Sequence, residues 1–166
     1  MWTEKKIQEI LAWHCINKGH HGICPNSGVF GWEADLVSFT NSFFGNEYEI
    51  KITKSNFRQD KKKQRKHWEL QKSKQTGPSY KNTPGPVYFW YCCPAELAAE
   101  IKLEIPEYAG LLAVRVNFVE VIKRAPRLHK EPISQQQYDF ILRGLMFRYW
   151  KQRNKNRIKG GSDGQD

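Results

Sequence analysis

Two short segments in the first third of the chain carry a pattern typical of pleated strands. Polar and apolar residues alternate over 33–39 and over 47–53, with a turn-forming stretch at 41–46 between them. Side chains of a strand point alternately to opposite faces, so the apolar members can cover a core while the others share one face. Like charges on neighbouring strands destabilise a sheet unless something binds them, so the pattern indicates a site. The shared face would hold Glu33, Asp35, Glu47, Glu49 and Lys51.

The remaining elements alternate between helix and strand. The spacing predicts helices over 3–16, 55–71 and 95–101, and a last helix that begins with a capping box of Ser134 and Gln137. Strands are predicted over 86–93, 111–116 and 118–123, and residues 20–32 are a loop or short strand. The core-facing stripe of the last helix would be Tyr138, Ile141, Leu142, Leu145 and Tyr149.

The order α-β-β-α-β-α-β-β-α describes an α/β domain with a mixed sheet flanked by helices. A chain of 166 residues buries one sizeable core, so we expect a single domain over 1–153. Residues 154–166, basic and then rich in glycine, are expected to form a flexible tail.

The positive charge of the chain is concentrated in two segments. With 27 Lys and Arg against 17 Asp and Glu, the formal net charge is +10, which suggests a polyanionic partner. Residues 51–66 hold eight Lys or Arg and one acid, and residues 143–159 hold seven and none. If 55–71 is one helix, positions 54, 58, 61 and 65 form a cationic stripe suited to a phosphate backbone. The candidate nucleic-acid contacts are Lys54, Arg58, Lys61, Lys62, Arg65, Lys66 and His67.

Metal-ligating residues of another kind occur early in the chain. His14, Cys15, His20, His21 and Cys24 lie close together, but they lack the repeated pairs of a structural zinc site. Cys15 falls on the apolar side of the first helix, so we expect a core cysteine there. No run of about 20 apolar residues and no apolar signal core is present, which predicts a cytoplasmic protein with no membrane partner.

At the acidic hairpin the chain resembles the PD-(D/E)XK nuclease superfamily, whose fold is restriction-endonuclease-like. Asp35 matches the first acid, and Glu49-Ile50-Lys51 matches the (D/E)XK element. Longer strings at 32–35, 48–51, 55–67, 93–97, 105–111 and 123–129 resemble a small-protein branch found in phages and bacteria. Ala34 replaces the usual Pro before the first acid, and Asn56 stands where that branch has Asp.

The resemblance implies Mg²⁺- or Mn²⁺-dependent hydrolysis of DNA phosphodiester bonds. Asp35 and Glu49, with the Ile50 carbonyl, would hold the ion, and Lys51 would position or activate the attacking water. Glu33 is a further candidate ligand, as are Glu4, Glu9 and Glu47. Asp60 and His67 could orient Lys51, although a solvated helix face is the default expectation for both. RNA as substrate and a homodimer remain open.

Two rival interpretations use the same fold. In the first, the protein binds nucleic acid without catalysis, which predicts salt-sensitive binding that does not depend on Mg²⁺. In the second, it is a phage-encoded adaptor that binds a host protein and has no affinity for DNA.

Overall fold

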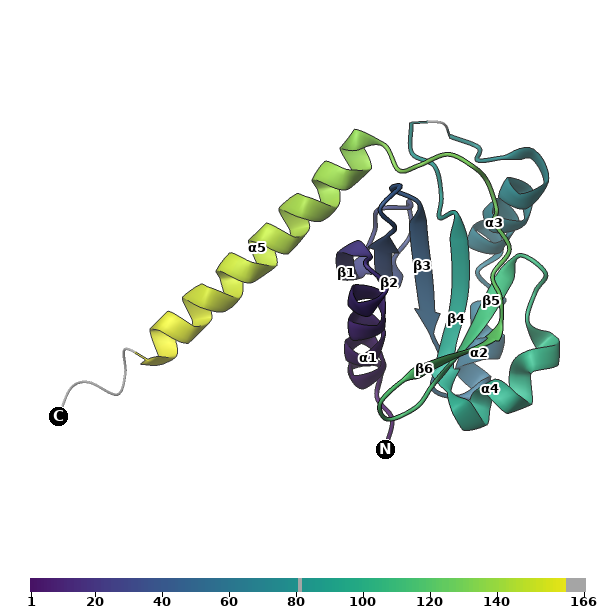
Figure 1. The fold of residues 1–166 in the computed structure, drawn as a ribbon, viewed down its shortest axis with the longest axis horizontal. Coiled ribbons are helices and arrows are strands. Elements are labelled where there is room, and N and C mark those ends of the chain that lie inside the picture. Colours follow the sequence, from purple (N-terminus) through teal and green to yellow (C-terminus); the bar gives the residue numbers. More distant parts are fainter. Residues whose placement is uncertain (81, 161–166) are drawn as a thin grey trace.

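The protein, described from a computed structural model over residues 1–80 and 82–160, is built on one six-stranded mixed sheet (Figure 1). The strands lie in the order of the sequence, with β1 and β6 at the edges. The first three strands pair antiparallel, β3, β4 and β5 run parallel, and β6 is antiparallel to β5. The strands are β1 (His21–Ser27), β2 (Ala34–Phe39), β3 (Gly45–Ile50), β4 (Tyr88–Pro94), β5 (Ala109–Val114) and β6 (Val119–Lys123).

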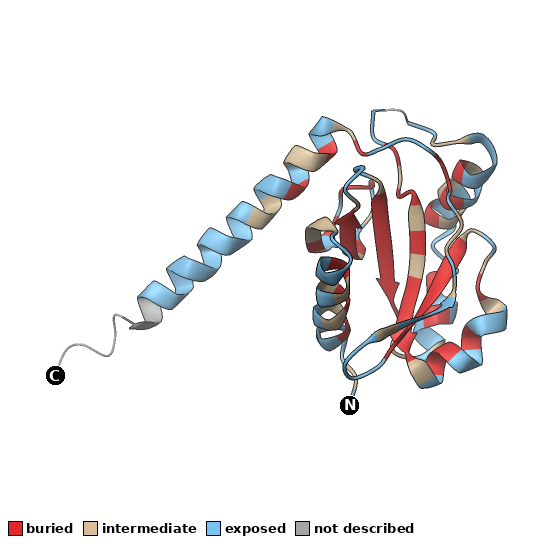
Figure 2. Ribbon diagram, viewed as in Figure 1, coloured by how far each residue is buried: buried red, intermediate tan, exposed pale blue. Residues whose placement is uncertain are grey.

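Helices cover both faces of this sheet. On one face, α1 buries Ile7 and Leu11 against Leu36, Tyr48 and Ile50. On the other face, helices from the middle of the chain cover a core centred on the aromatic residues of β4. Figure 2 shows the central strands largely buried between these layers, whereas edge strand β6 is mostly exposed. The helices are α1 (Glu4–Asn17), α2 (Lys54–Asp60), α3 (Gln64–Thr76), α4 (Ala95–Ile101), the short 3-10 turn η1 (Lys102–Glu104) and α5 (Gln135–Gly160).

The expected helix over 55–71 is two helices, because residues 61–63 break it between α2 and α3. An α-helix turns by about 100° per residue, so Phe57 and Leu70 would point to nearly opposite sides of one straight helix. Both side chains are buried in the same core against the sheet. The break lets α2 and α3 each turn an apolar side inward.

The last helix, α5, packs on the body only through its first turns and then projects away from it (Figure 1). The capping box forms as predicted, since Ser134 Oγ accepts the Gln137 N–H and Gln137 Oε1 accepts the Ser134 N–H. Ile141 is buried, but Leu142 and Tyr149, expected in the core, are 45% and 54% exposed. The helix continues to Gly160, past the boundary expected at 153, and residues 161–166 of the expected tail lie outside the described residues.

The α/β class with a mixed sheet flanked by helices is confirmed. Residues 20–32, left open between loop and strand, contain edge strand β1. Cys15, on the buried side of α1, lies in the core, and its thiol donates to Tyr48 Oη. Over the residues that the structure describes, no helix combines the length and apolar character needed to cross a membrane.

Candidate active site

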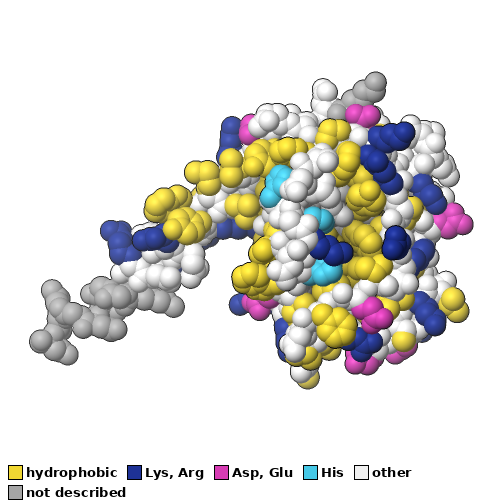
Figure 3. Space-filling model, viewed as in Figure 1, with side chains coloured by type: hydrophobic (Ala, Val, Ile, Leu, Met, Phe, Trp, Pro, Cys, Tyr) yellow, Lys and Arg dark blue, Asp and Glu magenta, His cyan; other side chains and the backbone are white. Residues whose placement is uncertain are grey.

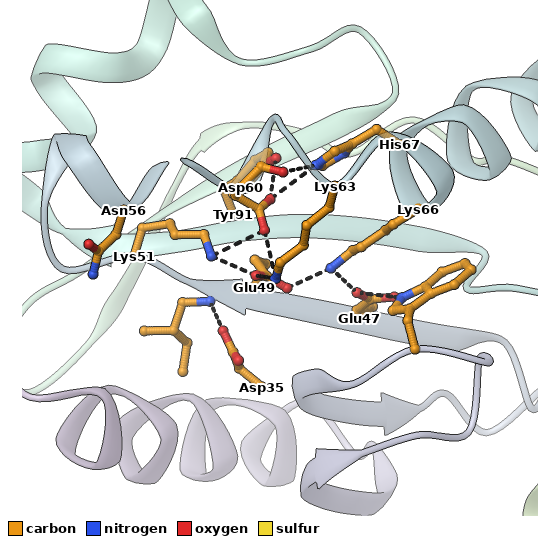
Figure 4. Close-up of polar contacts among 12 residues, drawn as sticks. Asp35, Glu47, Glu49, Lys51, Asn56, Asp60, Lys63, Lys66, His67 and Tyr91 are labelled. Carbon is orange, nitrogen blue, oxygen red and sulfur yellow. Dashed lines mark hydrogen bonds and ion pairs between the residues drawn. The ribbon is translucent and has the colours of Figure 1, made fainter. Parts of the chain in front are cut away.

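The acids of β3 lie inside the protein, beneath α2 and α3. Glu47 and Glu49 point to the same face of the sheet, as the alternation predicts, and Lys51 follows directly after the strand (Figure 4). Their exposed fractions are 0%, 1% and 7%. Burying bare carboxylates is costly, so the fold must supply partners for them.

Three lysines surround Glu49. Lys51 Nζ lies 2.5 Å and Lys63 Nζ 3.0 Å from Oε1, and Lys66 Nζ lies 2.5 Å from Oε2. The lysines come from the end of β3, from the break between the helices and from α3. Both carboxylate oxygens of Glu49 are therefore held by charged donors.

Glu47 shares one of these lysines. Lys66 Nζ is 2.6 Å from its Oε1, and Trp32 Nε1 donates to both of its oxygens at 2.9–3.0 Å. Burial raises the pKa of Glu47, and the Lys66 ammonium opposes that shift. Burial also lowers the pKa of Lys66, but Glu47 and Glu49 outweigh it and hold that pKa above its usual value. Lys66 is therefore a permanent buried cation that bridges two acids.

Asp60, at the end of α2, is the third buried acid of the cluster. Tyr91 donates to its Oδ2 at 2.9 Å, and His67 Nε2 lies 3.2 Å from the same atom. Lys51 and Lys63 lie 3.4 and 3.0 Å from Oδ1. Burial alone would raise the pKa of Asp60, but the hydrogen bond from His67 and the nearby lysines hold it well below its usual range.

The default expectation of a solvated helix face for Asp60 and His67 is wrong. Asp60 is 2% exposed, and the His67 ring is fixed between Asp60 and the Tyr108 hydroxyl. Asp60 is within reach of Lys51, so it contributes to holding that ammonium in place.

Asp35 lies apart from the lysines, at the neighbouring end of β2 (Figure 4). Its Oδ2 accepts the Ile50 N–H at 2.6 Å. Burial raises the pKa of Asp35 to about 6, the Glu49 carboxylate adds to this shift, and Glu4 contributes in the same direction. A half-buried carboxyl with its pKa raised by a neighbouring acid is a place where a cation would relieve repulsion.

The raised pKa of Asp35 makes a prediction about stability. Its folded pKa exceeds the ordinary 3.8, so its contribution is fully present below pH 3.8 and is lost as the pH rises through about 6. The variant Asp35→Asn keeps an acceptor for the Ile50 N–H but has no carboxyl group to titrate. We expect its free energy of unfolding to fall by about 2 kcal/mol less than that of the wild type between pH 4 and pH 8, a figure reduced for the partial exposure of Asp35. Urea unfolding in EDTA at pH 4 and pH 8 measures it. Equal pH slopes for the two proteins would contradict the assignment.

The expected metal ligands are only partly brought together. Asp35 accepts the N–H of Ile50, the residue that follows Glu49 in the chain. The Ile50 N–H points to β2, whereas the next N–H, of Lys51, points to Cys92 of β4. The N–H and C=O of a strand residue point to the same side, so the Ile50 carbonyl faces Asp35 as well. These oxygens suit a hard divalent ion, because Mg²⁺ takes one or two carboxylates and keeps several waters.

Of the other candidate ligands, Glu4 on α1 is near enough to raise the pKa of Asp35, and the remaining three do not lie beside the two acids. Glu33 is exposed outside β2, Glu9 is exposed on α1, and Glu47 is tied to Lys66 and Trp32. Within 1–80 and 82–160, no three His, Cys, Asp or Glu side chains are grouped to hold a metal ion. An ion here would rest on two acids, one carbonyl and water, and it would displace Lys63, the half-exposed lysine on Glu49.

The basic segment 51–66 is less available to a ligand than its charge suggests. Lys66 and His67 were expected to contact nucleic acid, but Lys66 is buried against Glu47 and Glu49, and His67 is half-buried against Asp60. The break between α2 and α3 also removes Arg65 from the expected stripe. The other members of that stripe, Lys54, Arg58 and Lys61, converge on Glu104 at 3.6–3.8 Å. Lys62 and Arg65 stay exposed.

Beyond Arg148, the second basic segment lies on the projecting part of α5, away from the acids (Figure 1). Arg148 is anchored on the carbonyls of Pro25 and Asn26 in β1. Figure 3 shows hydrophobic side chains along α5, followed by Lys and Arg further out. The two basic segments therefore do not form one groove around Asp35 and Glu49.

Sequence reasoning missed three members of the cluster, Trp32, Lys63 and Tyr91, whereas it already indicated Asp60 as a residue that could orient Lys51. Asp60 and Lys63 stand three residues apart at 3.0 Å, a spacing typical of an ion pair on a helix. Trp32 and Tyr91 gave no signal, because their roles arise from the pairing of distant segments.

Comparison with known proteins gives the fold alone. No family model matches the chain, and no curated protein matches it. A solved structure of a protein of unknown function from Silicibacter pomeroyi is similar, with a TM-score of 0.63 and 14% sequence identity. The match covers 100% of this chain and 97% of that one, so the whole architecture is shared.

Proposed function

We propose that the protein is a metal-dependent nuclease that hydrolyses DNA phosphodiester bonds, as its resemblance to the PD-(D/E)XK superfamily implies. The observation that carries the proposal is Lys51, a buried ammonium held 2.5 Å from Glu49, the acid that also raises the pKa of the half-buried Asp35. In this proposal Asp35, Glu49 and the Ile50 carbonyl hold Mg²⁺ or Mn²⁺. DNA is the partner, in the cytoplasm of a bacterial or phage-infected cell.

Each residue has a distinct task in this chemistry. A bound Mg²⁺ supplies Lewis acidity at the scissile phosphate and a bound water of lowered pKa. Lys51 donates to that water or to the developing phosphorane charge. Glu49 and Asp60 hold the Lys51 ammonium from two sides, which fixes its orientation. Lys62 and Arg65, both exposed nearby on the same basic segment, are available to the phosphate backbone.

The test is a cleavage assay on plasmid, linear, branched and single-stranded DNA, and on RNA, with Mg²⁺, Mn²⁺ or EDTA. We expect cleavage with Mg²⁺ or Mn²⁺ and none with EDTA. Asp35→Asn should lower the rate by at least about 100-fold, because it removes one of two anionic ligands. The exposed Glu9→Gln, on α1, is the matched control and should cleave as the wild type does. Cleavage retained by Asp35→Asn would overturn the proposal.

A second candidate is nucleic-acid binding without catalysis. The observation that favours it is the occupation of both Glu49 oxygens by lysine ammonium groups. It predicts salt-dependent binding of DNA, unchanged by Mg²⁺ and by Asp35→Asn, with no nicking of plasmid.

A further inference from the structure

A cavity of about 370 Å³ lies beside the buried charge cluster, on the side of Glu47. It is enclosed by the segment 28–32, by α3 and by residues 78–80, 83, 85 and 86. Its volume is within the range of small-molecule sites. Its lining includes Trp32, Leu70, Tyr80, Gly85, Arg65 and Ser73.

The walls of this cavity are held in place from outside it. Gln137 Nε2 donates to the carbonyls of Val29 and Pro84, which ties two of the enclosing segments to the start of α5. His129 Nε2 lies 3.0 Å from the Gly85 carbonyl, and Ser79 Oγ donates to Glu69 on α3 at 2.7 Å. Hydrogen bonds with Glu69 of α3, His129 and Gln137 of α5 therefore hold residues 79, 85 and 84 in place beside the cavity.

The lining combines apolar area with one buried polar group that has no partner, Ser73, and two charged side chains, Arg65 and Glu69. Trp32, Leu70 and Tyr80 offer flat or apolar surface. Ser73 is 7% exposed, and its hydroxyl is a buried group without a hydrogen-bond partner. Among the described residues, Arg65 at the rim has no carboxylate within ion-pair distance. A ligand with a flat ring, polar groups on the edge of the ring and a negative charge at the rim of the cavity would fit this lining. A nucleotide has these three features.

The cavity is also joined to the proposed active site through one side chain. Trp32 lines the cavity and donates through Nε1 to Glu47, which pairs with Lys66, which in turn holds Glu49. A ring placed against Trp32 would therefore be connected through Glu47 and Lys66 to Glu49, the residue that contacts Lys51.

We propose that this cavity receives the base of an unpaired nucleotide, stacked on Trp32, with Arg65 at its phosphate. The inference rests on the proposed function for the choice of ligand, and it deepens it by naming the substrate class. The preferred substrate is single-stranded or carries an unpaired base, because a base in an intact duplex cannot leave its stack without an energetic cost.

The experiment measures binding in EDTA, where no metal-dependent cleavage occurs. The probes are a duplex with one bulged 2-aminopurine and the same duplex fully paired, followed by fluorescence. Gly85→Leu should fill the cavity without strain, since a Cβ at position 85 would meet Trp32 at 3.9 Å and Gly85 has no left-handed φ. Gly144→Leu on α5, where a Cβ has open space, is the matched control.

We expect wild type and Gly144→Leu to bind the bulged duplex at least tenfold more tightly than the paired one, with a change in 2-aminopurine fluorescence. Gly85→Leu should lose that preference and keep its affinity for the paired duplex. Equal affinities of Gly85→Leu and wild type for the bulged duplex would overturn the inference, even if the cleavage assay supports the nuclease. A bulge preference that Gly85→Leu abolishes, without Mg²⁺-dependent cleavage, would instead support the cavity and overturn the nuclease proposal.

Discussion

Replacing Lys66 by Met should lower the free energy of unfolding by about 3–5 kcal/mol, the cost of removing one partner from a buried ion pair. Lys66 is 4% exposed and lies 2.5–2.6 Å from both Glu47 and Glu49. Met has a similar volume, so the loss would come from charge rather than from packing. Urea unfolding followed by circular dichroism at pH 7 measures it.

The exposed Lys62→Met is the matched control and should change stability by no more than about 0.5 kcal/mol. Adding Glu47→Gln to Lys66→Met removes the carboxylate left without its lysine. The double variant should regain at least about 1 kcal/mol relative to Lys66→Met alone. If the two losses simply add, Glu47 and Lys66 are not coupled as described.

Replacing Lys51 by Met should lower the rate of metal-dependent cleavage by at least about 100-fold, because it removes the donor aimed at the reacting water or phosphate. The fold should survive, since Glu49 and Asp60 each keep another lysine in contact. Single-turnover cleavage at saturating Mg²⁺ measures the rate, and near-ultraviolet circular dichroism reports the packing.

Lys63 is the sharpest control that the chain offers. It contacts the same Glu49 Oε1 and the same Asp60 Oδ1 as Lys51 does, but its side chain is 53% exposed. Lys63→Met should cleave within about threefold of the wild-type rate, because its ammonium is solvated and replaceable. Equal losses in the two variants would mean that the ammonium groups act only as general counter-charges to the acids.

The sheet could be predicted because its pattern is local. Alternation identified β2 and β3, an aromatic-rich run identified β4, and a capping box located the start of α5. The break between α2 and α3 could not be predicted, because nothing in 61–63 resembles a Gly or Pro break and the reason for it is the shared burial of Phe57 and Leu70. The length of α5 was not predicted either, because its outer half is polar and does not pack on a core, so its sequence has no core-facing stripe.

The site, like the fold, could be predicted only where it depends on a local pattern. Alternation placed Glu47, Glu49 and Lys51 on one face, and these side chains do share partners. It could not say that this face is covered, so Lys66 and His67 were expected at the surface. A basic helix gives no sign of which lysines turn inward, because that depends on acids in another element.

The strand order has a consequence for how the chain folds. Each strand pairs with the next one along the chain, so β1–β3 and β4–β6 can each form from near neighbours. The long connection, residues 51–87, separates these halves, and its closure carries most of the loop entropy. That closure pairs Glu49 with Tyr91 in the ladder and brings the Tyr91 hydroxyl to Asp60. The acids therefore lose contact with water when the two halves of the sheet join. Because their partners come from both halves, the charge cluster can form only when β3 and β4 pair in the correct register.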